Sequence, residues 1–227
     1  MVTGATGGLG GSVVARFVAE DRPVLAVGRD EGALAELAGS APEGLVAVRT
    51  ADLAEAAEVA ALFDAAEAEG GTPPAVAHLA GGFRYGKLAE LSDDDWRFLQ
   101  RANVETTFRM LAETSRRFAA AGGGSFVAVA APAASRGAAG VGAYSASKAA
   151  VLRLVESAAR EWAGFGGRAN AVLPGTMDTP ANRAAMPDAD RGRWVSTEAV
   201  AEVIHYLTTA AAHGVNGAAV RVTGPAG

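Results

Sequence analysis

The segment TGATGGLG, residues 3–10, decides the fold through the positions of its glycines. It follows the apolar residues Met1 and Val2 and opens a stretch whose apolar side chains recur at helical spacing. Glycines in such a turn permit a tight bend, let the backbone approach a pyrophosphate and let a strand and a helix pack closely. The free N–H groups and the positive dipole end of the helix would face the phosphates. The segment therefore predicts a strand–turn–helix unit that binds a dinucleotide, with an ordinary glycine turn as the alternative.

The start of the chain leaves little room for the strand before this turn. Only Met1 and Val2 precede it, whereas strands usually have about five or six residues. We therefore expect either a short stub of a strand or a natural protein that begins further upstream.

Short apolar runs alternate with longer helical patterns along the rest of the chain. The expected strands cover residues 22–28, 44–50, 75–80, 124–131, 168–173 and 218–224. The expected helices cover residues 9–20, 31–38, 54–69, 93–121, 143–163 and 197–212. Ser92 and Asp95 form a capping box at the start of the longest helix. This alternation predicts an α/β fold of Rossmann type, a doubly wound parallel sheet with helices on both faces. Because no linker, repeat or low-complexity segment interrupts it, we expect a single domain over residues 1–227.

The composition argues against several classes of protein. Half of the 227 residues are hydrophobic, yet no segment of about 20 residues is both predominantly apolar and free of charged side chains. No membrane span is therefore expected. Cysteine is absent and there are only three histidines, so neither a disulfide nor a metal site is expected. A formal charge of −5 argues against a nucleic-acid partner. Because the N-terminus lacks the pattern of a secretory signal, a cytoplasmic location is the default expectation.

The end of the second expected strand bears on the choice of cofactor. An acidic residue there would hold the ribose 2′-hydroxyl of NAD(H), but the chain has Gly28 followed by Arg29. An arginine can pair with a 2′-phosphate through two parallel hydrogen bonds, so NADP(H) is favoured over NAD(H). Asp30 keeps NAD(H) open as an alternative, because its carboxylate could reach the ribose instead. Asp52, after the third expected strand, is expected at the adenine amino group.

Tyr144 and Lys148, in the stretch GAYSASKAAV, stand four residues apart in an alanine-rich run. Residues at this spacing share one face of a helix, so both side chains can point into one cleft. An ammonium about 4 Å from the phenol, at an effective dielectric of about 20, would favour the phenolate by roughly 4 kcal/mol, or up to about three pKa units before desolvation losses. We therefore expect an acidified phenol. The alternative is a surface helix with a lysine that extends to solvent.

Six features in the same order resemble the short-chain dehydrogenase/reductase family across nearly the whole chain. They are TGATGGLG (3–10), Asp52, HLAG (78–81), Asn103, the pair Tyr144 and Lys148, and PGTMDT (174–179). The resemblance implies an oxidoreductase that transfers hydride from NAD(P)H to a small carbonyl or cyclic imine-like substrate. It makes Tyr144 the general acid, Lys148 a partner of the nicotinamide ribose, and Asn103 the residue that kinks its helix and holds a proton-relay water. The alternative for Asn103 is a solvent-facing residue inside a helix.

The resemblance also implies the contacts to the cofactor and the partners. The residues expected around the cofactor are Thr3, Gly4, Thr6, Gly8, Leu9, Gly10, Arg29, Asp52, Leu53, Ala80, Gly81, Tyr144, Lys148, Pro174, Gly175, Met177 and Thr179. His78 is expected to be a packed histidine, or to lie under the adenosine. The helices expected at 93–121 and 143–163 resemble those through which the family pairs its subunits. The expected partners are therefore a small-molecule substrate and further copies of the chain, in a homodimer or a homotetramer.

One residue typical of the family is missing. A serine usually stands thirteen residues before the tyrosine and donates to the substrate oxygen, but Ala131 occupies that position here. The lost donor is worth roughly 2–4 kcal/mol at a transition state. The chain is therefore expected either to be a catalytically silent NAD(P)-binding protein or to act on a substrate that does not need this donor.

The quinonoid dihydropteridine reductases, one subfamily, show a similar pattern. They carry alanine at the serine position, and LAGGF (79–83) and the segment 173–194 resemble the corresponding stretches of these enzymes. A quinonoid pterin accepts hydride readily, so it needs less electrophilic help. The chain departs from this subfamily at Thr3–Gly4, Gly28–Arg29 and Asn103, which keeps a general reductase as the first hypothesis. The residues expected to line the substrate pocket, beside a loop over about 180–196, are Phe83, Tyr85, Ala131, Met186 and Trp194.

Overall fold

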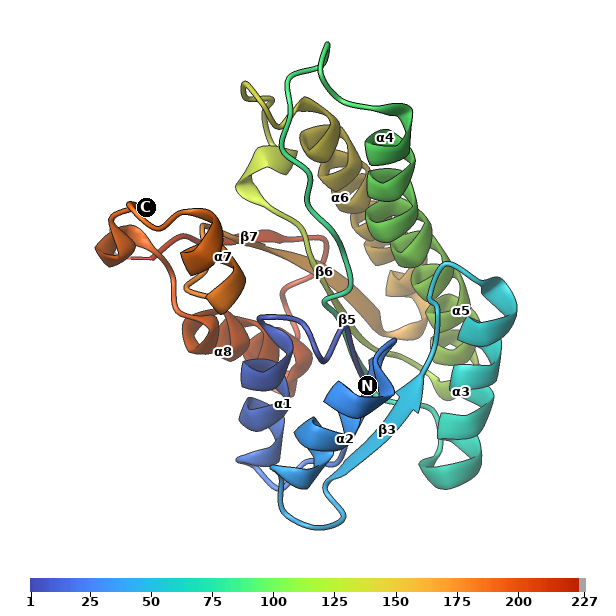
Figure 1. The fold of residues 1–227 in the computed structure, drawn as a ribbon. Helices are drawn as coiled ribbons and strands as arrows, with labels where there is room; N and C mark the ends of the chain where they lie inside the picture. Colours follow the sequence, from blue (N-terminus) through green and yellow to red (C-terminus); the bar gives the residue numbers. More distant parts are fainter. Residues whose placement is uncertain (225–227) are drawn as a thin grey trace.

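A parallel sheet runs through the middle of the molecule, and its carboxyl edge carries the candidate site. The computed structural model describes residues 1–224, in which seven strands pair in the order β3-β2-β1-β4-β5-β6-β7, all of them parallel (Figure 1). The strands are β1 (Val2–Thr3), β2 (Val24–Gly28), β3 (Val46–Thr50), β4 (Ala75–His78), β5 (Gly124–Val129), β6 (Gly167–Pro174) and β7 (Ala219–Val222). The chain winds first to one side of β1 and then, from β4 onward, to the other. Ligands of such sheets bind in the crevice at the carboxyl ends of the strands where the order reverses.

Helices cover both faces of the sheet. They are α1 (Gly10–Val18), α2 (Glu31–Gly39), α3 (Ala56–Gly70), α4 (Asp93–Leu99), α5 (Thr106–Ala121), α6 (Gly142–Trp162), α7 (Pro180–Ala185) and α8 (Thr197–Thr208). α1 and α8 pack together on one face, while α3, α5 and α6 cover the other (Figure 1). Along β5, Phe126 and Ala128 belong to the core under α5 and α6, whereas Val127 belongs to the core under α1 and α8. Successive side chains of a strand point to opposite faces of the sheet, so each strand contributes to both cores.

The Rossmann-type fold predicted from the sequence is confirmed, and the expected strands and helices are present with small differences at their ends, except for the helix over 93–121. β1 covers two residues, Val2–Thr3. The capping box at the start of α4 is also confirmed, because the Ser92 hydroxyl accepts a hydrogen bond from the Asp95 amide at 3.1 Å. The helix expected over 197–212 ends at Thr208, before a 3₁₀ turn at Ala210–Ala212. The short helix α7 was not expected.

The helix expected over 93–121 is interrupted, which corrects its expected range but agrees with the kink that the resemblance places at Asn103. A π-helical segment, Gln100–Glu105, separates α4 from α5. Such a segment disturbs the regular ladder of backbone hydrogen bonds and is frequently found at functional sites. The hydroxyls of Thr106 and Thr107 donate to the carbonyls of Ala102 and Asn103, at 2.8 and 2.6 Å, and so satisfy two of these groups.

Within residues 1–224, no helix combines the length and the apolar character that crossing a bilayer requires.

Candidate active site

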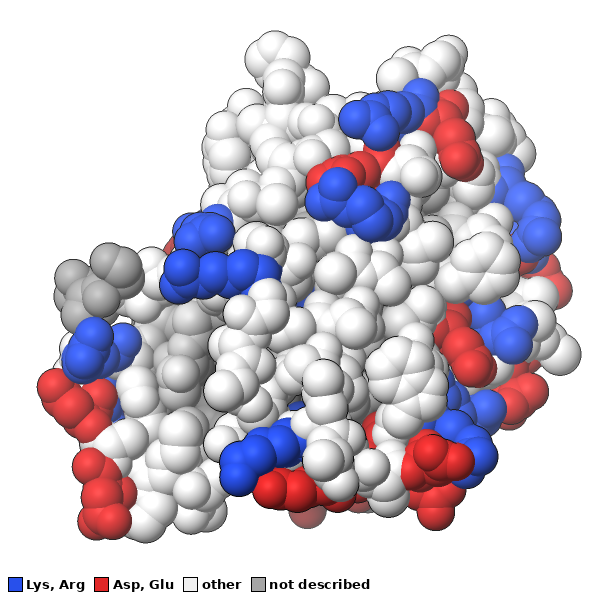
Figure 2. Space-filling view, turned by 90° about the horizontal axis from the view of Figure 1, so that it is seen from above, with Lys and Arg blue, Asp and Glu red and all other residues white. Residues whose placement is uncertain are grey.

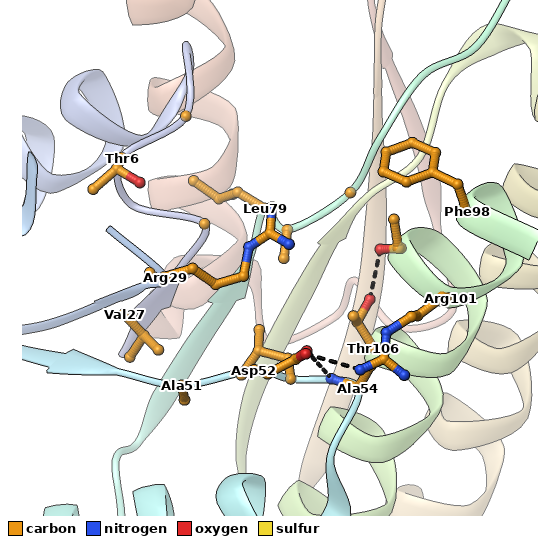
Figure 3. Close-up of a pocket in the computed structure, with 17 residues that line it drawn as sticks. Thr6, Val27, Arg29, Ala51, Asp52, Ala54, Leu79, Phe98, Arg101 and Thr106 are labelled. Carbon is orange, nitrogen blue, oxygen red and sulfur yellow. Dashed lines mark hydrogen bonds and ion pairs between the residues drawn. The ribbon is translucent and has the colours of Figure 1, made fainter. Parts of the chain in front are cut away.

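A hollow of about 280 Å³ opens where the strand order reverses (Figure 3). Its walls come from the β1–α1 turn, the ends of β2 and β4, the segment after β3, α4 and the start of the π-helix. The residues in its wall that were predicted to contact the cofactor are Gly4, Thr6, Arg29, Asp52, Leu53, Ala80 and Gly81. The predicted dinucleotide crevice thus coincides with an opening in the structure.

The glycine turn brings backbone segments into close contact. Gly4 has a φ of +69°, and a Cβ on it would lie 2.7 Å from the amide nitrogen of Ala80. A Cβ on Gly10 would lie 2.0 Å from the carbonyl oxygen of Ala5. Leu9 and Gly10 are buried where α1 begins. Glycine is therefore required at both positions, and the turn joins Gly4, Thr6 and Gly7, which line the hollow, to the N-terminus of α1.

Arg29 lies where the sequence places the choice of cofactor. Its exposed side chain extends into the hollow (Figure 3). A Cβ on Gly28 would lie 3.1 Å from Oγ1 of Thr6, so a larger residue would crowd the glycine turn. Asp30 is the N-cap of α2 and accepts a hydrogen bond from the Ala33 amide at 3.0 Å. This engagement weakens the alternative in which Asp30 binds the ribose.

Asp52 is held by two partners. One carboxylate oxygen accepts a hydrogen bond from the Ala54 amide at 2.9 Å, and the other accepts one from the Arg101 guanidinium at 2.8 Å (Figure 3). The Ala54 amide and, to a smaller extent, Arg101 keep the pKa of Asp52 below its ordinary value. Arg101 comes from the π-helix, lines the same hollow and also pairs with Glu55 at 2.8 Å. No sequence pattern pointed to Arg101, because 49 residues separate it from Asp52.

Tyr144 and Lys148 lie near the start of α6, one turn apart, as their spacing predicts. The Lys148 ammonium lies 6.0 Å from the centre of the Tyr144 ring and donates to the Val129 carbonyl at 2.9 Å. A Cβ on Gly81, in the wall of the hollow, would lie 3.0 Å from the same nitrogen. Lys148 is only 5% exposed, which makes the alternative of a solvent-extended lysine wrong. The pair therefore lies beside the predicted cofactor crevice.

Burial dominates the acidity of this pair. It raises the pKa of Tyr144 to about 12 and lowers the pKa of Lys148 to about 8. The expectation that Lys148 acidifies the phenol is therefore wrong for this arrangement. The ammonium is directed to the Val129 carbonyl, and the loss of water disfavours the charged form of both groups. At neutral pH the result is a protonated phenol beside a cation.

Asn103 is fully buried in the π-helix and joins three segments. Its Oδ1 accepts a hydrogen bond from the Gly82 amide at 2.9 Å, and its Nδ2 donates to the Gly82 carbonyl at 3.0 Å. Nδ2 also donates to the Ser147 hydroxyl at 3.0 Å, which donates to the Tyr144 carbonyl at 2.8 Å. The solvent-facing alternative for Asn103 is wrong, because its side chain ties the segment after β4 to the first turns of α6. The role of Ser147 was not predicted from the sequence, although its position between Tyr144 and Lys148 could have suggested that it belongs to the site.

The segment after β6 folds back onto the glycine turn. Thr179 is the N-cap of α7, and its methyl carbon would lie 2.9 Å from a Cβ on Gly8. The Asn182 side chain donates to the Met177 carbonyl at 2.8 Å. The two other residues predicted to contact the cofactor here, at the end of β6 beside β7, are Pro174 and Gly175. None of these residues lines the hollow, and among them Thr179 lies against the glycine turn at Gly8.

Ala131 and Phe83 represent the substrate side of the site. Ala131 is buried directly after β5, and Ser135, the next hydroxyl along the chain, is exposed. Phe83 packs edge-on against Tyr144, with ring centres 4.9 Å apart, and remains half-exposed. The structure therefore brings Phe83 to Tyr144, whereas the usual serine donor has no substitute nearby in the chain.

The other residues expected in the substrate pocket are spread over the surrounding loops. The Tyr85 ring lies against Gly140, where a Cβ would approach it to 2.4 Å. Met186 ends α7 and is partly exposed, while Trp194 is buried after a 3₁₀ turn. The contact of Tyr85, Met186 and Trp194 with a substrate stays a prediction that rests on their positions in the sequence.

His78 is packed in the core at the end of β4. Its Nδ1 lies 2.8 Å from the Thr3 hydroxyl, and its ring lies 5.9 Å from that of Phe126. Burial, and then the charge of Lys148, lower the pKa of His78 to about 3. The interpretation as a packed, neutral histidine is confirmed, and the Thr3 hydroxyl is engaged with it.

Known proteins are similar to this chain in sequence and in fold. The family model for short chain dehydrogenases matches residues 1–190. The chain is 35% identical over 198 residues to the 2,3-dihydro-2,3-dihydroxybenzoate dehydrogenase of Escherichia coli. The matched region covers 87% of this chain and 73% of that protein. It is 31% identical over 244 residues to the (3R)-3-hydroxyacyl-CoA dehydrogenase of Mus musculus, covering 99% and 94%. The solved structure of a short-chain type dehydrogenase/reductase from Mycobacterium ulcerans gives a TM-score of 0.90 at 32% identity, covering 97% of this chain and 86% of that one.

The chain belongs to the short-chain dehydrogenase/reductase family and is an oxidoreductase of that family. Members of the family use NAD(P) and act on small molecules. The residues present fit a dinucleotide, because a Cβ at Gly4 or Gly8 would fill the space that separates the turn from Ala80 and Thr179. α1 begins directly after this turn, and a helix N-terminus can bind an anion.

Proposed function

We propose that this protein is an NADP(H)-dependent oxidoreductase of the alcohol–carbonyl class that transfers hydride to a small carbonyl or cyclic imine-like substrate. The observation that carries the proposal is the convergence of Tyr144, Lys148 and Asn103 beside Gly81, at the wall of the hollow. When bound, the nicotinamide supplies the hydride. The side chains of the protein orient the substrate and supply the proton.

Tyr144 is suited to keep its proton until the substrate takes it. A pKa of about 12 leaves the phenol protonated at neutral pH. Lys148, with a pKa of about 8, is then a cation, and its proposed role is to bind the nicotinamide ribose beside Tyr144. Asn103 acts through Ser147 to hold the turn of α6 that carries both groups.

The preference for NADP(H) follows from the residues at the adenosine end of the hollow. Arg29 extends into it, Gly28 replaces the acid that would hold a ribose hydroxyl, and Asp30 is used as a helix cap. A guanidinium at this position matches the geometry and charge of a 2′-phosphate.

The buried methyl group of Ala131 favours a substrate that needs little electrophilic help. A quinonoid dihydropterin is such a substrate, and the edge contact of Phe83 with Tyr144 presents an aromatic surface to a flat ring. We therefore keep a quinonoid dihydropteridine reductase-like activity as the second candidate. The third is a catalytically silent NAD(P)-binding protein, which Ala131 also favours. On the face seen from above, Lys and Arg side chains lie among Asp and Glu side chains toward the periphery, and no large patch carries one sign of charge (Figure 2).

We further propose that residues 1–227 form one catalytic domain, with a substrate loop over about 180–196, and that the chain assembles as a homodimer or homotetramer. α4 and α5 leave Trp96 and Phe108 exposed by 47% and 55%. Large exposed aromatic side chains on neighbouring helices suit an interface between subunits.

A substrate panel tests these proposals. Simple ketones, quinones and quinonoid dihydropterin are offered with NADPH and with NADH, and the absorbance of the reduced nicotinamide is followed. The first candidate predicts turnover of a carbonyl compound with NADPH. Ala131→Ser should then accelerate an unactivated ketone while leaving a quinonoid substrate nearly unchanged. Binding of NADPH without turnover of any of these compounds would favour the silent protein.

A further inference from the structure

Three charged side chains face the adenosine end of the hollow, and the proposed function has so far used only one of them. Of the seventeen residues that line the hollow, only Arg29, Asp52 and Arg101 carry a formal charge at neutral pH (Figure 3). Arg29 and Arg101 contribute +2 and Asp52 contributes −1, which leaves a net charge of +1. The sign of this end therefore depends on both arginines.

The carboxylate of Asp52 cannot easily turn away from the hollow. The Ala54 amide holds one of its oxygens at 2.9 Å, and Arg101 holds the other at 2.8 Å. A lone carboxylate at this position would repel a 2′-phosphate, since like charges brought together at a binding site disfavour the complex. Arg101 cancels that charge without removing the side chain.

Arg101 is suited to this task because it comes from a different part of the fold. It stands on the π-helix, while Asp52 follows β3 and Arg29 follows β2. Its guanidinium also pairs at 2.8 Å with Glu55, which is not among the residues that line the hollow. Asp52, drawn with its bond to Arg101 in Figure 3, and Glu55 together hold the Arg101 side chain.

We propose that Arg101 is a second determinant of cofactor selectivity, which pairs with Asp52 and so removes the negative charge that would oppose a 2′-phosphate at Arg29. This inference rests on the NADP(H) preference proposed above. It assigns selectivity to an ion pair between two distant segments, in addition to the residue at the end of β2.

The experiment measures binding of two fragments by titration calorimetry on the full chain. Adenosine 2′,5′-bisphosphate represents the adenosine end of NADP(H), and 5′-AMP represents that of NAD(H). Arg101→Gln should weaken the bisphosphate about tenfold and change 5′-AMP by less than about twofold. Arg97→Gln, which removes an exposed guanidinium from α4 outside the hollow, is the matched control and should change neither. Thermal unfolding shows that both variants are folded.

A double variant separates neutralisation from direct contact with the phosphate. If Arg101 acts by neutralising Asp52, then adding Asp52→Asn to Arg101→Gln should restore most of the lost preference for the bisphosphate. No restoration, or equal weakening of both fragments by Arg101→Gln, overturns the inference. If the wild-type protein prefers 5′-AMP, the NADP(H) preference fails and this inference fails with it. If the wild type prefers the bisphosphate and Arg101→Gln keeps that preference, only the role of Arg101 is overturned.

Discussion

The adenosine end and the catalytic end of this site differ in how they hold charge. At the adenosine end, the side chains of Arg101 and Asp52 are 49% and 37% exposed, and water screens their attraction. At the catalytic end, Lys148 and Asn103 are 5% and 0% exposed, and burial shifts the pKa of Lys148 and of Tyr144. Substitutions at the adenosine end are therefore expected to change cofactor binding only modestly. At the catalytic end, burial changes the pKa values of the side chains by a large amount. In this chain, the residues proposed for cofactor choice and those proposed for proton transfer therefore lie in different physical environments.

The largest expected effect tests the proton donor at the catalytic end. Tyr144→Phe keeps the ring against Phe83 but removes the hydroxyl, so turnover should fall by about 10²–10⁴-fold. The Kd for NADPH, measured by fluorescence titration, should stay within about twofold of the wild-type value, because the phenol supplies the proton and contributes little to cofactor affinity. Tyr206→Phe, on α8, is the matched control and should keep full turnover. Equal activity of the Tyr144 variant and the wild type would remove Tyr144 from the mechanism.

The next prediction concerns the pH dependence of turnover. Burial lowers the pKa of Lys148 to about 8, so its ammonium is present below that pH and is lost above it. Turnover should therefore be level below about pH 8 and fall about tenfold per pH unit above it. Lys87→Met changes the other lysine, which is exposed, and should leave the profile unchanged. A profile that falls only near the ordinary lysine pKa would mean that Lys148 is not desolvated as described.

A smaller effect is expected on stability in acid, from the histidine buried near Lys148. The folded state keeps His78 neutral down to about pH 3, whereas the unfolded state binds a proton below about pH 6.5. Stability is therefore lost as the pH falls through this window, by about 2 kcal/mol between pH 7 and pH 5. Urea unfolding at both pH values should show that His78→Asn removes most of this loss.

Each histidine needs its own comparison in that measurement. His213→Asn replaces an exposed histidine and should leave the loss between the two pH values as in the wild type. If His78→Asn shows the same loss as the wild type, the acid sensitivity comes from other groups, such as His205, whose pKa is also lowered by burial.

The smallest expected effect lies at the adenosine end, where water screens the charges. Arg29→Gln removes the guanidinium that extends into the hollow, so the KM for NADPH should rise about tenfold while that for NADH changes less. Arg49→Gln, on the neighbouring strand β3, is a suitable control because its side chain pairs with Glu69. A loss of equal size for both cofactors would assign Arg29 to general binding rather than to selectivity.

Most of the fold could be predicted because its signals are local. The glycines of residues 3–10 and the alternation of apolar runs predicted the parallel sheet and the order of its elements. The π-helix at Gln100–Glu105 could not be read from the same periodicity. It accompanies the burial of Asn103 and its hydrogen bonds to Gly82 and Ser147, which are contacts between separate segments.

The candidate site was predictable in its residues but not in its physical state. Tyr144, Lys148 and Asn103 were found from their spacing and from the family resemblance, and the structure brings them together. The direction of the Tyr144 pKa was wrong, because an assumed distance to Lys148 took no account of the Val129 carbonyl that holds the ammonium. Ala131 shows the opposite case, since the missing hydroxyl is evident from the sequence alone.

The sequence by itself determined the class of fold, the glycine turn, the tyrosine and lysine on one helix face and the loss of the serine donor. These features depend on residue type and on separations of a few residues. In a helix or a strand, such a separation fixes the face to which each side chain points. Tertiary structure alone decided the burial of Lys148 and Tyr144 and the pairing of Arg101 with Asp52. Desolvation and charge pairing depend on which distant segments meet in space, and local spacing does not contain that information.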